Sequence, residues 1–239
     1  MRPYQRLLVV GDSMVLGVTE LRGKEIVSVT RPTCVDHVRD FFRDCEIVMN
    51  AEIHRKTNDV LSTLPNLLET TKPDYVLFAL GGNDADIDWK RFIVSQGKIV
   101  RTQVSIEKLR ANLLKLIEIT RQHGAEPIVS LFVSHCLSVR GEYLSRLTGM
   151  EVSQWIANGG GDLVAEPELQ KYWSMIESLA AEQQVRVASY GRVLRAEDPA
   201  QMLASDGAHP TAQGHWVIAK AMISTLMTSD RTKDVLIAG

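Results

Sequence analysis

Cysteine, an excess of one charge and long apolar runs are all scarce in this chain of 239 residues. The three cysteines, Cys34, Cys45 and Cys136, are odd in number and lack paired spacing, which indicates neither a disulfide framework nor a zinc site. The 27 basic and 29 acidic residues leave a net charge of −2. This balance favours neither nucleic acid nor an anionic membrane surface as a partner.

The apolar runs are too short for membrane insertion or export. No run approaches the roughly 18 apolar residues that a membrane-spanning helix requires. The first run, residues 7–10, is also shorter than the apolar core of a signal peptide. We therefore expect a soluble, cytoplasmic protein without a membrane span, unless a leader has been removed.

Short apolar runs alternate with longer amphipathic segments along the chain. Five runs without polar alternation are predicted to be buried strands: 6–10, 46–50, 75–80, 127–133 and 185–189. Four segments with apolar residues at helical spacing are predicted to be helices: 57–71, 105–124, 167–184 and 210–227. This alternation predicts a single α/β domain over residues 1–239, with a mainly parallel sheet covered by helices on both faces.

Two segments are too long to be simple connections between these elements. Residues 84–104 and 137–166 each follow a predicted strand, so both should emerge at the carboxyl edge of the sheet. We expect these insertions to form a lid or substrate wall. The alternative is a peripheral helical insertion that only covers the core.

Three polar clusters interrupt this pattern: Gly-Asp-Ser at 11–13, Gly-Gly-Asn-Asp at 81–84 and Asp-Gly-Ala-His at 206–209. Taken singly, each has an ordinary structural explanation as a helix cap or a turn. The first cluster lies inside "LLVVGDSMVLG", which reads as a strand followed by a helix-like segment. That reading places Ser13 at a helix start.

Together the clusters contain the parts of a nucleophilic mechanism. A serine hydroxyl such as that of Ser13 needs an adjacent base, and His209 can provide one as a neutral imidazole. Asp206 precedes His209 by one turn and can hold its other ring nitrogen. The side-chain amide of Asn83 and the backbone N–H of Ser13 can stabilise an oxyanion, the latter with help from a helix dipole.

These clusters resemble those of the SGNH (GDSL-type) hydrolase family. The resemblance is carried, in the family's order, by "GDSMVLG", "LGGND" and "DGAHPTAQGHWVIAKAM", and it spans nearly the whole chain. It implies a flavodoxin-like three-layer α/β/α sandwich with a mainly parallel five-stranded sheet. It also implies ester hydrolysis or acyl transfer on a small-molecule ester, without metal or organic cofactor. By resemblance, Ser13 is the nucleophile, Asp206 and His209 are its partners, and Asn83 is the oxyanion asparagine.

One position departs from the family pattern. The family normally has a glycine whose backbone N–H completes the oxyanion hole, and "NAEIHRKT" (50–57) has Arg55 there. Arg55 retains an N–H, but a left-handed conformation at this position would cost about 1–2 kcal/mol relative to glycine. Either the loop takes a different path, or the hole rests on Ser13 and Asn83.

The same stretch suggests a substrate preference. The charges of His54, Arg55 and Lys56 would favour an anionic ester, such as one of an acidic sugar or a phosphorylated headgroup. Alternatively, these side chains extend into solvent, as basic residues usually do. Asp12 and Asp84, beside the catalytic clusters, join His54 and Arg55 as candidate substrate-binding residues.

Two further groups of polar residues are expected to play no part in the chemistry. Asp84, Asp86 and Asp88 alternate in a loop but lack the continuation of a calcium-binding loop, which predicts solvated side chains. His135 and Cys136 are neighbours on a strand pattern and point to opposite faces, which favours a structural role.

The favoured hypothesis is therefore a serine-dependent esterase, including one that removes acetyl groups from a sugar or lipid-like substrate. A degenerate family member that binds a glycan or lipid without turnover is one alternative, and Arg55 is the feature in its favour. Another is a metal-dependent phosphoesterase, whose ligands would include Asp12, Asn83, Asp206 and His209. That site lacks further histidines, and no metal site is expected. The sequence favours no particular oligomeric state.

Overall fold

A parallel sheet forms the centre of the protein. The computed structural model describes residues 5–23, 25–99, 101–133, 135–160 and 162–228. The central sheet has five strands in the order β4-β1-β5-β6-β7, and every pairing is parallel. These strands are β1 (Arg6–Gly11), β4 (Glu46–Ala51), β5 (Tyr75–Ala79), β6 (Glu126–Ser130) and β7 (Arg186–Ala188). All five predicted strands are confirmed, although the one predicted over 127–133 ends three residues early.

Side chains of the central strand β1 alternate between two hydrophobic cores. Leu8 and Val10 belong to the core on one face of the sheet, whereas Leu7 and Val9 belong to the core on the other. All four are buried. The continuous apolar run that predicts this strand is thus explained, because successive strand residues face opposite sides and both sides are covered.

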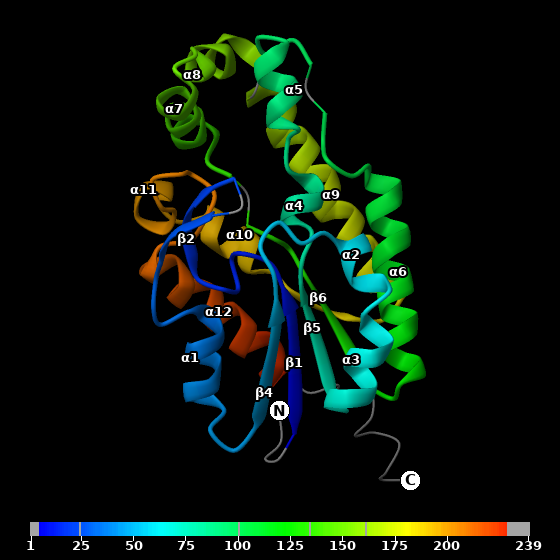
Figure 1. Cartoon of the computed structure of the whole chain (residues 1–239). Coiled ribbons are helices and arrows are strands. Elements are labelled where there is room, and N and C mark those ends of the chain that lie inside the picture. Colours follow the sequence, from blue (N-terminus) through cyan, green and yellow to red (C-terminus); the bar gives the residue numbers. More distant parts are fainter. Residues whose placement is uncertain (1–4, 24, 100, 134, 161, 229–239) are drawn as a thin grey trace, which may run out of the picture.

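Helices cover both faces, which confirms the three-layer α/β/α sandwich (Figure 1). One face carries α2 (Thr57–Leu61), α3 (Leu64–Thr71), α6 (Ile106–Gln122) and α9 (Asp162–Glu182). The other carries α1 (Cys34–Phe41), α10 (Tyr190–Arg195), α11 (Pro199–Met202) and α12 (Ala212–Met227). Within the described part of the chain, no helix combines the length and apolarity needed to cross a membrane.

Two predicted helices differ from the structure. The helix predicted over 57–71 is divided into α2 and α3, with Pro65 in the first turn of α3. Proline lacks the N–H that would continue α2 but is tolerated in a first turn. The helix predicted over 167–184 begins earlier, at Asp162, and ends at Glu182.

The segment after β1 is not helical, which corrects the expectation for Ser13. Residues 12–17 form a turn, followed by an antiparallel hairpin of β2 (Val18–Arg22) and β3 (Glu25–Val29). Gly17 has a φ of 78°, and a Cβ there would lie 2.7 Å from the carbonyl oxygen of Thr30. This left-handed glycine ends the turn and starts the hairpin. The backbone N–H of Ser13 is therefore not at the start of a helix, and no helix dipole adds to its effect on an oxyanion.

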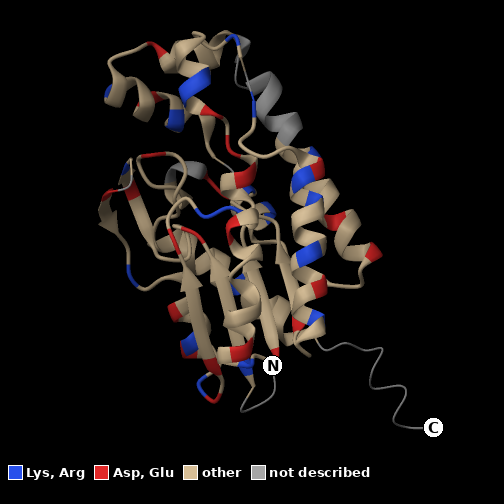
Figure 2. Cartoon of the chain, turned by 45° about the vertical axis from the view of Figure 1, so that its right-hand side comes forward, with Lys and Arg blue, Asp and Glu red and all other residues tan. Residues whose placement is uncertain are grey.

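The two insertions pack against each other beyond the carboxyl edge of the sheet (Figure 1). Residues 84–104 contain α5 (Trp89–Val94), and 137–166 contain α7 (Leu137–Thr148), α8 (Val152–Trp155) and a π-helical turn (Ile156–Gly160). They share a separate hydrophobic cluster of Ile87, Trp89, Phe92, Tyr143, Leu144, Val152 and Ile156. Figure 2 marks both basic and acidic residue positions along the ribbon of the insertions.

Candidate active site

The carboxyl edge of the sheet brings the three polar clusters together. Ser13 follows β1, Asn83 lies in the short helix α4 (Gly82–Ala85) after β5, and His209 precedes α12. Parallel strands end at the same edge, so residues far apart in sequence become neighbours there. Ser13 and His209, 196 residues apart, are in direct contact.

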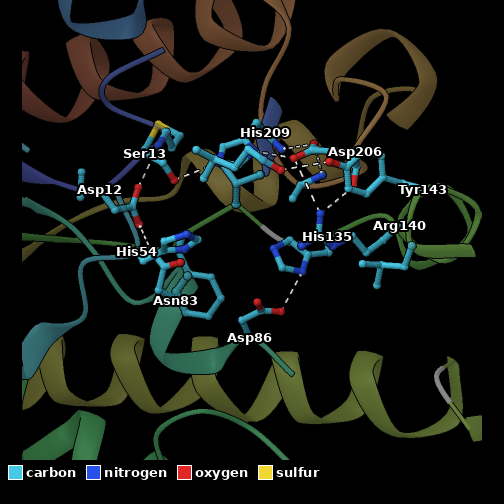
Figure 3. Close-up of a pocket in the computed structure, with 18 of the residues that line it drawn as sticks. Asp12, Ser13, His54, Asn83, Asp86, His135, Arg140, Tyr143, Asp206 and His209 are labelled. Carbon is cyan, nitrogen blue, oxygen red and sulfur yellow. Dashed lines mark hydrogen bonds and ion pairs between the residues drawn. The ribbon is translucent and has the colours of Figure 1, made fainter. Parts of the chain in front are cut away.

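Ser13, His209 and Asp206 form a continuous hydrogen-bonded chain (Figure 3). The Nε2 atom of His209 lies 2.9 Å from Ser13 Oγ, and its Nδ1 lies 2.6 Å from Asp206 Oδ2. Burial favours a neutral Asp206, but the hydrogen bond and charge of His209 lower the pKa of Asp206 to about 2. An ionised carboxylate only accepts, so the ring proton belongs on Nδ1, and Nε2 is free to accept the serine proton.

The loop that carries Asp206 is shaped by its own side chain. Asp206 Oδ1 accepts hydrogen bonds from the backbone N–H groups of Ala208 (2.9 Å) and His209 (3.0 Å). Gly207 has a φ of 68°, and a Cβ there would lie 2.5 Å from the backbone nitrogen of Arg140. This turn explains the spacing of three residues between the carboxylate and the imidazole.

Asp12 fixes the side chain of Asn83 beside Ser13. Asn83 Nδ2 donates to Asp12 Oδ2 and to the carbonyl oxygen of Arg55, both at 3.1 Å. The other oxygen of Asp12 accepts from the backbone N–H of Met14 at 3.0 Å. Burial raises the pKa of Asp12 to about 6. The amide nitrogen of Asn83 is thereby held at the cavity wall.

Arg55 does not line the cavity, contrary to its assignment as a substrate-binding residue. Its Nη1 donates to Asn50 Oδ1 at 2.6 Å and to the Asn50 carbonyl oxygen at 2.9 Å, and its Nη2 pairs with Glu52 at 3.1 Å. The side chain is buried by these contacts. The positive φ of this loop, 57°, falls on His54 instead, so Arg55 bears no left-handed strain. This removes the feature that favoured a non-catalytic binding protein.

Asp84 is neither solvated nor exposed to substrate, which corrects both expectations for it. Its carboxylate is fully buried and accepts hydrogen bonds from the N–H and hydroxyl of Thr57. Asn112 donates to the same hydroxyl at 2.9 Å. Burial raises the pKa of Asp84 against these hydrogen bonds. Asp84 therefore ties α4, which carries Asn83, to α2 and α6.

A cavity of about 450 Å³ opens above Ser13. Its lining from the sheet edge includes Asp12, Ser13, Met14, Ala79, Gly82, Asn83, Phe132, Tyr190, Asp206 and His209. The hairpin contributes Leu21 and Gly23, whose carbonyl oxygens contact Tyr143 Oη at 3.0 Å and His54 Nε2 at 2.7 Å, respectively. Of the candidate substrate-binding residues, Asp12 and His54 thus line the cavity.

Side chains of the two insertions, with His135 after β6, form the opposite wall of the cavity. The sequence predicts a wall from these insertions but did not single out Asp86, His135 or Arg140 as cavity residues. Asp86, His135, Arg140, Tyr143, Leu144 and Leu147 line it. Arg140 Nη1 donates to the carbonyl oxygen of Asp206 at 3.2 Å and lies 3.7 Å from its carboxylate. His135 Nδ1 lies 3.1 Å from Asp86 Oδ1, and both side chains are less than a quarter exposed. The prediction of a solvated Asp86 is therefore wrong. The position of His135 directly after a predicted strand was the available signal.

The acidic and histidine side chains do not assemble a metal-binding group. Among the residues that the structure describes, no set of three or more His, Cys, Asp or Glu side chains is arranged to hold an ion. Asp206 and His209 instead point toward each other and toward Ser13 (Figure 3). This arrangement favours serine chemistry over metal-dependent phosphoester cleavage.

The family model for GDSL-like lipases and acylhydrolases matches residues 9–217. The chain belongs to this family. Its membership confirms the resemblance to SGNH hydrolases and the prediction of a serine ester hydrolase. No curated protein sequence matches the chain significantly.

Solved structures similar to this chain have the same fold. A lipase/acylhydrolase from Enterococcus faecalis is 17% identical, with 92% of this chain and 94% of that one covered and a TM-score of 0.65. A catalytic mutant of Axe2, an acetylxylan esterase from Geobacillus stearothermophilus, is 17% identical, with 96% and 97% covered and a TM-score of 0.67. LAE5, an alpha/beta hydrolase enzyme from the metagenome of Lake Arreo in Spain, is 19% identical, with 94% and 96% covered and a TM-score of 0.65.

Proposed function

We propose that this GDSL-like hydrolase cleaves carboxylic esters through an acyl-enzyme on Ser13. The hydrogen-bonded chain from Ser13 through His209 to Asp206 carries this proposal. Ser13 Oγ attacks the ester carbonyl carbon as its proton passes to His209 Nε2. The tetrahedral intermediate collapses, and the same proton goes to the departing alcohol. Water, deprotonated by His209, then releases the carboxylic acid.

The oxyanion is stabilised by the backbone N–H of Ser13 and the side-chain amide of Asn83. Both residues line the cavity. The two hydrogens of the Asn83 amide point to Asp12 and to the Arg55 carbonyl, so one of these bonds is exchanged for the oxyanion during the reaction. The guanidinium of Arg55 takes no part, because it faces Asn50 and Glu52.

The preferred substrate is a small, uncharged ester. The cavity is lined by three carboxylates, Asp12, Asp86 and Asp206, and by one guanidinium, that of Arg140. This balance disfavours an anionic ester, and the charge of Arg55 is balanced by Glu52. One similar structure is described as an acetylxylan esterase, which supports an acetylated sugar as a candidate. The insertions act as the wall against which such a substrate rests.

Trapping the acyl-enzyme tests this mechanism directly. The protein is mixed with 4-nitrophenyl acetate, the reaction is quenched in acid, and the protein is digested. The mass of the peptide that contains Ser13 is then measured by mass spectrometry. We expect a burst of nitrophenolate and one acetyl group on Ser13, and neither with Ser13→Ala. A nitrophenolate burst without acetylated Ser13 would contradict the proposal. Excess chelator is expected to leave the rate unchanged.

A further inference from the structure

The cavity contains a second histidine–aspartate pair that the proposed mechanism does not use. His135 Nδ1 lies 3.1 Å from Asp86 Oδ1, and the side chains are 22% and 19% exposed, respectively. His135 follows β6, whereas Asp86 belongs to the insertion after β5. Both residues line the same cavity as Ser13. Figure 3 shows His135 with Asp86 on one side and the His209–Asp206 pair on the other.

Asp86 is held rigidly in its ionised form. Its Oδ1 accepts hydrogen bonds from the indole N–H of Trp89 at 2.9 Å and the backbone N–H of Ile87 at 2.8 Å. Burial opposes ionisation, but the interaction with His135 and the charge of Arg140 lower the pKa of Asp86. The carboxylate is therefore a fixed acceptor that orients the imidazole, as a carboxylate does for a metal-binding or catalytic histidine.

This orientation determines what the other ring nitrogen can bind. An ionised carboxylate only accepts, so His135 carries its proton on Nδ1 and, as a neutral ring, presents a lone pair on Nε2. Nε2 has no hydrogen-bond partner within the part of the chain that the structure describes. A group that fits it must donate a hydrogen bond. A hydroxyl does so, whereas a carboxylate or phosphate oxygen does not.

The wall that carries His135 adjoins the leaving-group end of the site. Arg140, on α7, contacts both the carbonyl oxygen and the carboxylate of Asp206. His209, which protonates the departing alcohol, lies on the same loop as Asp206. The alcohol portion of the ester must sit by His209 when it leaves, which brings it toward this wall.

We propose that His135, oriented by Asp86, is a specificity-determining residue that accepts a hydrogen bond from a free hydroxyl group on the alcohol portion of the ester. The proposal rests on the acyl-enzyme function assigned to Ser13. It narrows the substrate class to esters of diols, polyols or sugars. Asp86 acts through His135 and is a positioning residue. A site built around such an acceptor discriminates against an alkyl analogue, because the bound alkyl group would cover the acceptor and leave it unpaired.

Three acetate esters of similar size separate the possibilities. The wild-type enzyme is assayed with 2-hydroxyethyl acetate, with propyl acetate, which has a methyl group in place of the hydroxyl, and with acetoxyacetate, which carries a carboxylate. We expect kcat/KM to be about tenfold higher for the hydroxyl ester than for the alkyl ester, and lowest for the anion. Equal rates for the first two, or a preference for acetoxyacetate, would overturn the proposal.

Matched histidine substitutions locate the effect. His135→Leu is expected to bring the ratio between hydroxyl and alkyl esters close to one. His135→Gln, whose amide oxygen can accept the same hydrogen bond, should retain part of the preference, and Asp86→Asn should give an intermediate ratio. His123→Leu, in which a surface histidine at the end of α6 is changed, should keep the wild-type ratio. An unchanged ratio in His135→Leu would contradict the assignment.

The two proposals fail in different ways. If His135 does not bind the hydroxyl group, Ser13 is still acetylated by every ester, and only the preference for the hydroxyl ester is missing. If the acyl-enzyme proposal is wrong, none of the three esters acetylates Ser13. Thermal unfolding of each variant identifies those that lose selectivity through misfolding. If His135→Leu is misfolded, the ratio of rates measured with His135→Gln decides the question.

Discussion

The two sides of the cavity are built in different ways. On the sheet side, Ser13 and Asn83 follow neighbouring parallel strands, and the register of β1 against both partners continues to Gly11, two residues before the nucleophile. On the insertion side, Asp86 and Arg140 depend on a separate hydrophobic cluster that two insertions share. The proposed reacting groups thus lie at the edge of the hydrogen-bonded sheet, whereas Asp86 and Arg140 lie on segments that are added to it.

The two histidine–aspartate pairs differ in the same way. Asp206 and His209 are three residues apart in one turn, so their contact is local and is supported by two further backbone hydrogen bonds. Asp86 and His135 come from different segments and meet only when the insertions are in place. Changes to the insertions should therefore alter selectivity while the chemistry at Ser13 persists. The following changes test that separation.

The largest effect is expected on the sheet side, from Asp206→Asn. The amide cannot act as an anionic acceptor for His209 Nδ1, so the imidazole loses the tautomer that accepts the proton of Ser13. A fall in kcat of about 10⁴-fold is expected, with little change in the preference for hydroxyl esters. Steady-state kinetics with both esters measure it. A fall below tenfold would mean that this pair does not orient the base.

Asn83→Ala should have the next largest effect. Removing one oxyanion donor typically lowers kcat by about 10²–10³-fold, and here it also leaves Asp12 without its amide partner. We expect kcat to fall with KM nearly unchanged, because the interaction forms fully only in the transition state. A rise in KM at constant kcat would instead place Asn83 in ground-state binding.

Asp12→Asn tests how the buried carboxyl of Asp12 affects the stability of the protein. Burial raises the pKa of Asp12 from 3.8 to about 6, so its contribution to stability is present below about pH 4 and is lost as pH rises through 6. The difference of about 2 pKa units corresponds to at most about 3 kcal/mol. Urea unfolding should therefore show that the free energy of unfolding of the variant, relative to that of the wild-type protein, is higher at pH 8 than at pH 4. Asp40→Asn, at an exposed position, should show no such pH-dependent gain.

Arg140→Gln tests the contact between the two sides and should have the smallest effect. Arg140 Nη1 donates to the carbonyl oxygen of Asp206 at 3.2 Å and lies 3.7 Å from its carboxylate. Removing the guanidinium loosens the turn that carries Asp206 and His209, so kcat/KM should fall by about two- to tenfold for both esters. Steady-state kinetics measure the fall.

The control for that loss is a second arginine outside the cavity. Arg192 forms an exposed ion pair with Glu177 at 2.7 Å, and Arg192→Gln should leave kcat/KM unchanged. An unchanged kcat/KM in Arg140→Gln, or an equal fall in both variants, would show that Arg140 does not support the Asp206–His209 pair.

The sheet side could be predicted from the sequence because its signals are local. Continuous apolar runs predict strands that are buried on both faces, and polar clusters that follow such runs predict the edge at which Ser13, Asn83 and His209 meet. The turn geometry at Asp206 is also local, since three residues suffice to join the carboxylate to the imidazole.

The insertions were expected to form a lid or wall, but three features around the cavity could not be predicted from the sequence. The burial of Arg55 follows from its contacts with Asn50 and Glu52, which a basic stretch does not reveal. The contact of Asp86 with His135 requires the insertion after β5 to meet the segment after β6. The hairpin after Ser13 was missed because Gly17, whose positive φ ends the turn, resembles any other glycine in the sequence.

The central claim is that the sheet edge activates Ser13, and covalent labelling measures this most directly. The protein is incubated with a fluorophosphonate probe, and the modified peptide is identified by mass spectrometry, with Ser13→Ala as the control. We expect one phosphonyl group on Ser13 in the wild-type protein and none in the control. A folded wild-type protein that remains unlabelled, or that is labelled equally in the Ser13→Ala variant, would contradict the account.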